Sequence, residues 1–455
     1  MKVTRIVSRS LADNHFRLDA AFHSAEGKAF QRSIERSNLK FMALSEVTES
    51  IFNGPRFSRC YIDDSSRGIR FLSSSDMLRA DLSNVKLLSR KHTHSLEKLK
   101  IYRGWILVSC SGTIGNMIYC SEQHNGYTAS QHIMRIVPNR KVLPGYLFAF
   151  LSSRYGKSMI TQGTYGAVIQ HIEPQHIQNL PVPILDSNFS RIVHSLTEEA
   201  SKLRTEASRT VNTTLQAFGL KVLNVDQNPS YQYPRDRFLA CEKTRIHHMR
   251  LDGYHNIGYC REGRDLIKRP TVLGTYVKAY QPPIFKRPYV KNGIPFMSGM
   301  DLYDAHPQVT NQLSRKMIGI EKYIVDAGTI LVQNVGQRYG LFGRPVVLHR
   351  HLDKSAVTQH LTRIYPRKDR DKGFVYFFLL SEIGRRCLLG NSFGTSMGVL
   401  FKKSFLECPC PETDDDLRAQ FNKPFVEFVT KRDQAIAKEK EAVQLVEQEL
   451  SKWLD

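Results

Sequence analysis

The chain carries two successive copies of one residue pattern. The segment Gly68–Met77, with the sequence GIRFLSSSDM, returns as Gly293–Leu302, GIPFMSGMDL, at an offset of 293 − 68 = 225 positions. A solenoid unit spans only about 20 to 50 residues, so a repeat at this distance is a repeat of whole domains. The sequence therefore predicts a fold built by domain duplication.

Four more matches occur in the same order in both copies, at offsets between 224 and 233. They pair Arg17–Asp19 with Arg250–Asp252, Gly104–Val108 with Gly328–Val332, Thr128–His132 with Ala356–His360, and Gly145–Leu151 with Gly373–Leu379. An unchanged order with slightly changing offsets indicates two complete domains that differ by short insertions. We expect a first domain over residues 1–185 and a second over residues 223–411, joined by residues 186–222 and followed by residues 412–455.

The net charge of +22 is concentrated in the two expected domains. Residues 1–185 carry 24 Lys and Arg against 13 Asp and Glu (+11), and residues 223–411 carry 29 against 15 (+14). Residues 186–222 carry 5 against 4 (+1), and residues 412–455 carry 7 against 11 (−4). Positive charge placed in this way is expected of domains that contact a polyanion, and nucleic acid is the first candidate. A membrane surface fits less well, because no basic amphipathic helix or lipidation signal occurs, and a basic protein without such a ligand is the alternative.

Other classes of protein are disfavoured by composition. The chain has no apolar run of about 18 residues and no charged-then-apolar leader, so we expect a cytoplasmic protein rather than a membrane or secreted one. Its 8 cysteines are scattered, without paired C-x-x-C spacing. We interpret them as buried free thiols rather than metal ligands.

Each copy reads as a mixed α/β (α+β) domain. Short apolar runs at Ile106–Cys110 and Ile330–Asn334 precede Gly-containing turns, and this pattern is typical of buried strands. Aromatic and Leu-rich stretches at Tyr146–Ser153 and Phe374–Ser381 indicate packed helices, with Gly156 and Gly384 expected as stop signals. Both copies then close on Pro-x-Pro, at Leu180–Pro183 and Cys408–Pro411.

A long amphipathic helix is expected after each proline closure. Apolar residues recur at helical spacing in the first, from about Phe189 to Leu215, namely Val193, Leu196, Ala200, Leu203, Ala207 and Val211. The second follows the acidic Thr413–Asp416 and repeats every seven residues, at Val429, Ile436, Val443 and Leu450. The two apolar seams are most simply buried against each other, which predicts an antiparallel coiled coil; packing of each helix on its own domain is the alternative.

This arrangement resembles the specificity subunit of type I restriction-modification enzymes over nearly the whole chain. The motifs that carry the resemblance are the doubled G-I-x-F-[LM]-S segment, G-x-[ILV]-L-V before a Gly-rich turn, Gln-His followed by a strand (133–137 and 361–365), the Gly163-Thr164 and Gly394-Thr395 loops, and the paired helices. The resemblance implies two target recognition domains that each read one half of a split duplex DNA site. It also implies that the helices set the gap and recruit methyltransferase subunits, two in number, which bind S-adenosylmethionine and methylate adenine. A restriction subunit can then join, and the recognition subunit of a related phage-defence system is the alternative.

Loop residues with donors and acceptors for base edges and phosphates are the candidate DNA contacts. In the first domain the base-reading candidates are Ser73, Ser74, Ser75, Ser109, Ser111, Thr113, Gln131, His132, Thr164 and Tyr165. In the second they are Ser298, Asn334, Gln337, Arg338, Gln359, His360, Asn391 and Thr395. The phosphate-contacting candidates lie in a Gly/Pro-rich loop of each copy and are Arg56, Arg59, Arg67, Lys286, Arg287 and Lys291. For any single base-reading candidate, a turn residue bonded to the backbone is the alternative, and the doubled Gln-His pair can be architectural.

No catalytic residue or metal site is expected on the chain. Asn228–Tyr231 approaches the N-P-P-[YF] loop of adenine methyltransferases, but its third position departs and no glycine-rich loop for S-adenosylmethionine follows a strand. The acidic residues 414–416, 439 and 441 lie on the expected terminal helix, where a cap or a solvated face explains them. The His92-x-His94 and His247-His248 pairs lack further ligands at metal spacing. A self-contained methyltransferase or nuclease, and a basic scaffold for protein or RNA, are the competing hypotheses.

Overall fold

A computed structural model describes residues 26–83, 85–111, 114–162, 171–223, 255, 258–338, 340–394 and 397–454. The chain divides into two compact units. The first contains the chain up to Arg79, Val85–Thr205 and Gln434–Asp455, and the second contains Ala80–Asn84 and Glu206–Asp433. Each unit thus holds one copy of the repeat, together with a stretch of each of the two long helices that follow the copies. The domain boundaries expected from the sequence stay a prediction.

The first unit is built on two small sheets. One is antiparallel with the order β2-β9-β6-β7, formed by Thr48–Asn53, Ile133–Pro138, Ile106–Ser109 and Met117–Tyr119. The other has the order β3-β5-β4-β8, formed by Tyr61–Ile62, Leu87–Ser89, Gly68–Leu72 and Thr128–Ala129, with β4 and β8 parallel. The proline closure forms strand β10 (Pro181–Pro183), which pairs with β1 (Phe41–Ala43). The shorter helices are α3 (Glu26–Arg36), α4 (Leu96–Leu99), α5 (Pro144–Ser152), α6 (Arg154–Gln162) and α7 (Pro174–Ile177).

The second unit repeats this topology. Its antiparallel sheet has the order β12-β21-β17-β19, formed by Val277–Tyr280, Leu361–Pro366, Ile330–Gln333 and Pro345–Val347. The mixed sheet has the order β13-β15-β14-β20-β16, formed by Tyr289–Val290, Asn311–Leu313, Ile294–Met297, Ser355–Val357 and Ile324–Val325. Two strand pairs complete it: β11 (Pro270–Val272) with β23 (Pro409–Pro411), and β18 (Val335–Gly336) with β22 (Gly398–Val399). The shorter helices are α10 (Gly258–Asp265), α11 (Lys372–Leu380), α12 (Glu382–Gly390), α13 (Lys402–Leu406) and α14 (Asp415–Ala419).

The parallel strand pair has the same register in both copies. Phe71 lies opposite Thr128 in the first, and Phe296 lies opposite Ala356 in the second. The mixed α/β class and the duplication predicted from the sequence are therefore confirmed, and β16 is an extra strand of the second sheet.

The expected role of Gly156 and Gly384 as helix stops is wrong. Helices α5 and α11 end earlier, and both glycines lie inside the helices that follow, α6 and α12. Ser153 and Ser381 start these helices, since their hydroxyls accept hydrogen bonds from the Gly156 and Gly384 amides at 3.2 and 3.0 Å. The glycines are needed for close packing, because a Cβ would approach the Phe150 oxygen to 2.3 Å and the Phe378 oxygen to 1.9 Å.

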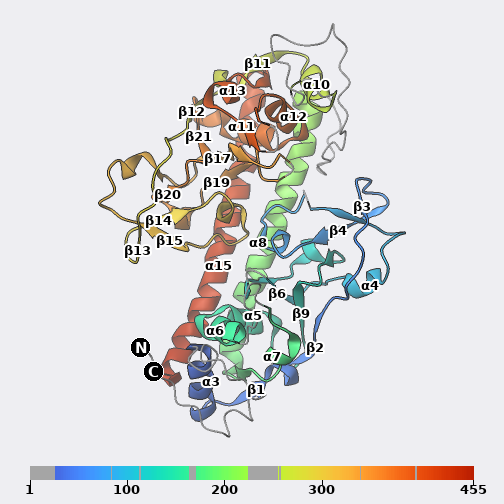
Figure 1. The fold of residues 1–455 in the computed structure, drawn as a ribbon, viewed down its shortest axis with the longest axis vertical. Coiled ribbons are helices and arrows are strands. Elements are labelled where there is room, and N and C mark those ends of the chain that lie inside the picture. The colour runs from blue at the N-terminus through green and yellow to red at the C-terminus, as the bar shows by residue number, and fades with distance from the viewer. Residues whose placement is uncertain are drawn as a thin grey trace. The chain divides into compact units, whose positions relative to one another are not determined.

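The two long helices are α8 (Ser187–Phe218) and α15 (Asn422–Leu454), and in each unit a stretch of one lies alongside a stretch of the other (Figure 1). In the first unit Lys438 pairs with Glu199 at 3.2 Å, and in the second Lys431 pairs with Glu206 at 3.2 Å. Within the second unit Thr210 of α8 also donates to Glu427 of α15 at 3.2 Å, so contacts that advance along α8 retreat along α15 and the pair is antiparallel, as predicted.

Both helices also pack on the domains. The predicted pairing of the two helices and packing of helices on the domains therefore occur together. Ala442, Val446 and Leu450 of α15 belong to the core of the first unit, together with Val193 and Leu196 of α8. The core of the second unit takes Ala207, Leu215 and Phe218 from α8, and Phe425 and Phe428 from α15. Of the expected seam residues, Leu203, Val211, Val429 and Val443 are only half-buried.

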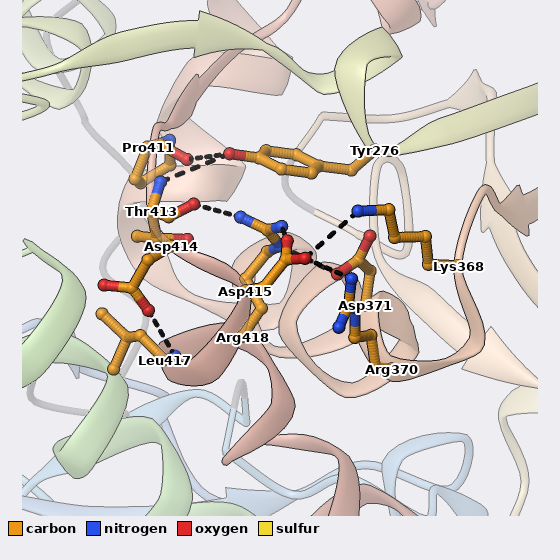
Figure 2. A network of polar contacts seen from close by, with 10 residues as sticks. All are labelled: Tyr276, Lys368, Arg370, Asp371, Pro411, Thr413, Asp414, Asp415, Leu417 and Arg418. Carbon is orange, nitrogen blue, oxygen red and sulfur yellow. Dashed lines mark hydrogen bonds and ion pairs between the residues drawn. The ribbon is translucent and has the colours of Figure 1, made fainter.

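A buried arginine ties the start of the terminal helices to the second domain (Figure 2). Arg418 of α14 donates through Nε to Asp371 at 2.8 Å and also bonds Asp415 and the Thr413 carbonyl. The Tyr276 hydroxyl donates to the Pro411 carbonyl at 3.1 Å, so strand β23 and α14 are held at the same place. Along the described part of the chain, no helix is long and apolar enough to cross a bilayer.

Candidate nucleic-acid interface

Each copy presents a loop in which basic and aromatic residues alternate. The loops share the pattern P-x-F-x-R-x-Y, as Pro55–Tyr61 in the first copy and Pro283–Tyr289 in the second, and we call them the basic–aromatic loops. Each runs into the edge strand of its mixed sheet, β3 or β13. Basic residues of these loops were predicted to contact phosphates, but the shared pattern becomes visible only when the two copies are aligned at an offset of 228 residues.

The aromatic residues anchor these loops to the sheet. The Phe57 ring lies edge-on at 5.9 Å from the Phe71 ring, and the Phe285 ring lies edge-on at 6.3 Å from the Phe296 ring. Phe71 and Phe296 are buried central residues of β4 and β14. Because the rings point inward, the basic side chains between them are left exposed to solvent.

Arg59 and Arg287 occupy equivalent places in the two loops. Their guanidinium carbons lie 5.3 Å from the ring centroids of Phe71 and Phe296, within the range of a cation–π contact. Arg59 Nη2 is 3.4 Å from Ser130 Oγ, and Arg287 Nη2 is 3.4 Å from Thr358 Oγ1. Each arginine therefore connects its loop to the turn that carries the Gln-His pair, the Gln-His turn (Ser130–His132 and Thr358–His360).

The Gln-His turns also have matching internal geometry. Gln131 Nε2 lies 3.2 Å from His132 Nε2, and Gln359 Nε2 lies 3.2 Å from His360 Nε2. Burial and the neighbouring Arg59 lower the pKa of His132, while burial and Arg287 lower the pKa of His360. A neutral ring nitrogen can accept the glutamine amide hydrogen. The glutamine oxygen lies 3.4 Å from the Ser130 hydroxyl in the first copy and 3.3 Å from the Thr358 hydroxyl in the second.

The first copy adds a hydroxyl and a second imidazole to this turn. Ser111 Oγ lies 3.0 Å from His132 Nδ1 and 2.8 Å from His171 Nδ1. The buried Asn334 stands where the first copy has Cys110, and the backbone N–H groups of Cys110 and Asn334 donate to the His132 and His360 carbonyls at 3.0 and 2.9 Å. The two turns thus share a framework but differ in the polar groups beside it.

The six phosphate-contacting candidates are all exposed, namely Arg56, Arg59, Arg67, Lys286, Arg287 and Lys291. Among them Arg67 forms an exposed ion pair with Asp64 at 3.4 Å. Because these side chains project from the basic–aromatic loops and the adjoining strand turns, each copy has a positive surface next to its Gln-His turn.

Several base-reading candidates are engaged in turns instead. Ser73 Oγ donates to Asp76 at 2.5 Å, and Ser298 Oγ donates to Asp301 at 2.7 Å, in equivalent positions. Ser74 Oγ donates to the His132 carbonyl at 3.2 Å, and Ser75 Oγ lies 3.1 Å from Ser73 Oγ. The Ser74 contact is a bond to the backbone, which was the alternative, while the other three contacts join side chains of the turn. The roles of these serines toward DNA stay predictions.

Three further candidates are buried. Arg338 donates to the carbonyls of Phe393 and Gly394 at 3.0 and 2.6 Å. Asn391 donates to the Ser404 carbonyl at 3.1 Å, and Ser109 accepts from the Asn116 amide at 3.1 Å. By contrast Gln337 is exposed beside Arg338. The candidates Thr113, Thr164, Tyr165 and Thr395 lie outside the described residues, as do Asn228–Tyr231, His247 and His248.

Two acidic residues of the terminal helices, Asp414 and Glu439, have local partners. Asp414 caps α14 by accepting from the Leu417 amide at 2.6 Å, and Glu439 forms an ion pair with Arg204 of α8. Within the described ranges, no group of three or more His, Cys, Asp and Glu side chains is arranged to hold a metal ion. Six of the seven described cysteines are buried, and all seven are free thiols.

One family model matches part of this chain, and solved structures align with most of it. Residues 36–198 match the family model described as "Type I restriction modification DNA specificity domain". No curated protein matches the chain in sequence. Among solved structures, the type I restriction-modification S subunit from M. genitalium aligns over 92% of this chain and 96% of its own, at 13% identity and a TM-score of 0.34.

Two other solved structures align over similar lengths. The HsdS subunit from Thermoanaerobacter tengcongensis aligns over 91% of this chain and 96% of its own, at 16% identity and a TM-score of 0.27. A chain from a study of complex assembly and conformational transition of the type I R-M system aligns over 91% and 97%, at 16% identity and a TM-score of 0.28.

The matched range 36–198 contains all ten strands of the first unit, and the second unit repeats their order and register. The resemblance stated from the sequence motifs is therefore confirmed. Residues 36–198 of this chain are similar to the type I restriction modification DNA specificity domain.

Proposed function

We propose that this chain is the sequence-reading subunit of a type I restriction-modification system and that its two domains read the two halves of a split duplex DNA site. The observation that carries the proposal is the twinned surface, with a basic–aromatic loop beside a Gln-His turn in each copy. Exposed arginine and lysine supply sequence-independent attraction to phosphates, while glutamine can pair with base edges in the major groove. The framework is common to both domains and the neighbouring polar residues differ, which suits two half-sites of different sequence.

The chain recruits methyltransferase subunits, two in number, that methylate adenine within the site; a restriction subunit can complete the assembly. S-adenosylmethionine then binds to the methyltransferase subunits, while this chain contributes recognition and no catalysis. The paired helices α8 and α15 are the proposed spacer, since a helix of 32 residues at 1.5 Å per residue is about 48 Å long. The assembly acts in the cytoplasm, where it has access to chromosomal DNA.

Mapping of methylated adenines in cells with and without the gene tests this proposal. The expected result is a set of adenines that loses methylation when the gene is deleted, lying in a motif with two defined ends and an arbitrary middle. A continuous target motif would contradict bipartite reading, and an unchanged methylation pattern would contradict the role in modification.

A second experiment separates this proposal from a self-contained enzyme. The purified full chain is incubated with duplex DNA and labelled S-adenosylmethionine, with and without the methyltransferase subunits. Methyl transfer is expected only when those subunits are present, and transfer by the chain alone would overturn the proposal. Competition between duplex DNA and RNA across a salt series distinguishes the DNA reader from an RNA scaffold.

A further inference from the structure

Each copy buries an arginine in its central strand. Arg135 is the third residue of β9 and Arg363 is the third residue of β21, and their exposed fractions are 0% and 1%. Burial lowers the pKa of each guanidinium from its usual value to about 10. Burying a cation is costly unless its donors are satisfied, so such a residue needs a structural or functional reason.

Each guanidinium group binds four backbone carbonyls, and the two sets occupy equivalent positions in the two domains. Arg135 Nη1 donates to the oxygens of Ser130 and Ile133 at 2.8 and 2.6 Å, and Arg363 Nη1 donates to those of Thr358 and Leu361 at 3.0 and 2.5 Å. The Nη2 atoms donate to Ala129 at 2.5 Å and Val357 at 2.7 Å, and more weakly to Leu99 at 3.3 Å and Tyr323 at 3.4 Å. Equivalent carbonyls are thus gathered in both domains.

Three of these four carbonyls flank or belong to the Gln-His turn. The turn therefore curves around the guanidinium, and its glutamine, Gln131 or Gln359, is half-buried. In the first copy the arginine also supports the start of the basic–aromatic loop, because a Cβ on Gly54 would lie 3.0 Å from Arg135 Nη1. The planar fork of arginine can direct several donors at fixed angles, which a lysine ammonium cannot do.

We infer that Arg135 and Arg363 are positioning residues, each of which holds the Gln-His turn of its own domain in the geometry needed to read one half-site. This inference rests on the proposed function, because it assigns the turns to base reading. The two arginines do not contact DNA themselves. Their effect on recognition passes through the backbone of residues 129–133 and 357–361.

The test uses the full chain with Arg135→Lys or Arg363→Lys, which keep the positive charge but lose the fork. A pool of duplexes with a randomised centre is selected by the wild-type chain and by each variant. We expect Arg135→Lys to relax base preference in one half of the selected motif and Arg363→Lys in the other. A loss of about tenfold in discrimination at the affected positions is expected, as for one mismatched base pair. The dependence of affinity on salt should stay unchanged, because the phosphate contacts remain.

A control variant and a second measurement distinguish loss of turn geometry from a general effect of replacing a buried arginine. Arg418→Lys removes the fork of another buried arginine of the second unit that bonds Asp371 instead of the turn (Figure 2), and it should leave base preference intact. Hydrogen exchange is measured in peptides that cover residues 129–133 and 357–361, without DNA. Each turn variant should exchange about tenfold faster in its own turn only, since its carbonyls lose their common donor.

Wild-type exchange in both turns of the variants would overturn the inference, whatever the DNA result. So would unchanged base preference, or an equal relaxation of both halves by Arg418→Lys. If the wild-type chain selects no motif while the turns exchange faster, the proposed function is wrong and the mechanical role of the two arginines stands.

Discussion

At the scale of single residues, arginine side chains have two different roles in this chain. Exposed Arg59 and Arg287 lie over aromatic rings and face solvent, while buried Arg135 and Arg363 collect backbone carbonyls. The first kind can neutralise phosphates, and the second can fix the shape of a turn. A count of net charge does not distinguish them.

The buried His124 should make the first unit sensitive to acid. Its Nδ1 accepts from the Ser121 amide at 3.1 Å, and burial lowers its pKa from 6.5 to about 4. Between these two values the unfolded chain binds more protons, so the stabilisation is fully present above pH 6.5 and is lost as the pH falls toward 4. At pH 5 we expect a loss of about 2 kcal/mol relative to pH 7 from this group.

Urea unfolding followed by tryptophan fluorescence measures this loss, because Trp105 and Trp453, the 2 tryptophans of the chain, both belong to the first unit. His124→Asn keeps an acceptor near the Nδ1 position and cannot take up a proton. The variant should show a smaller decrease between pH 7 and pH 5, and an equal decrease in both proteins would refute the assignment.

Gly156 and Gly384 should not tolerate a methyl group. Since an added Cβ would approach a backbone oxygen to 2.3 or 1.9 Å, Gly156→Ala and Gly384→Ala should each destabilise the chain by about 2 kcal/mol through overpacking. The control is Gly340→Ala, whose Cβ would meet only the Gln337 oxygen at 3.4 Å. Thermal unfolding followed by circular dichroism compares the three, and equal midpoints would show that the packing has been misjudged.

At the scale of elements, the sequence predicts the strands and helices better than their ends. The strand Ile330–Gln333, the helix Lys372–Leu380 and the long helix Ser187–Phe218 lie where apolar periodicity indicates them. Gly384 was wrongly predicted to end a helix, because a glycine in a sequence indicates either a helix end or a close packing contact. Only the neighbouring backbone in the folded structure distinguishes the two. Arg338 was assigned to DNA for a similar reason, since its residue type does not reveal that its donors serve the carbonyls of Phe393 and Gly394.

The pairing of α8 with α15 should depend on one buried ion pair. The side chains of Arg204 and Glu439 are only 12% and 11% exposed, so Glu439→Ala leaves a buried guanidinium without its carboxylate. A loss of about 3 kcal/mol is expected for the first unit, measured by urea unfolding with tryptophan fluorescence. Glu199→Ala, which removes the exposed partner of Lys438, should cost less than about 1 kcal/mol. Similar losses in the two variants would mean that burial does not control the pair.

At the scale of the whole molecule, duplication explains why so much can be read from one sequence. Each motif is weak alone, but its return in the same order restricts both copies to one topology, as the order of their corresponding strands shows. Different base preferences would arise where the copies differ, such as Ser111, whose hydroxyl lies 3.0 Å from His132 in the first copy, and Asn334, which stands where the first copy has Cys110. Those differences carry no periodic signal, so the DNA bases cannot be derived from them.

The length of the helix pair should set the gap in the DNA site. Seven residues inserted after Thr205 and another seven after Asp433 preserve the heptad seam and lengthen each helix at the residue where the chain passes from one unit to the other. Seven residues add about 10 Å, equivalent to about three base pairs at 3.4 Å each. Mapping of methylated adenines should therefore give a motif whose two ends are unchanged and whose middle is about three base pairs longer. An insertion in α8 alone should abolish modification, because it displaces ion pairs such as Lys438–Glu199 and Lys431–Glu206 relative to each other. A middle of unchanged length in the double insertion would show that something other than these helices measures the distance.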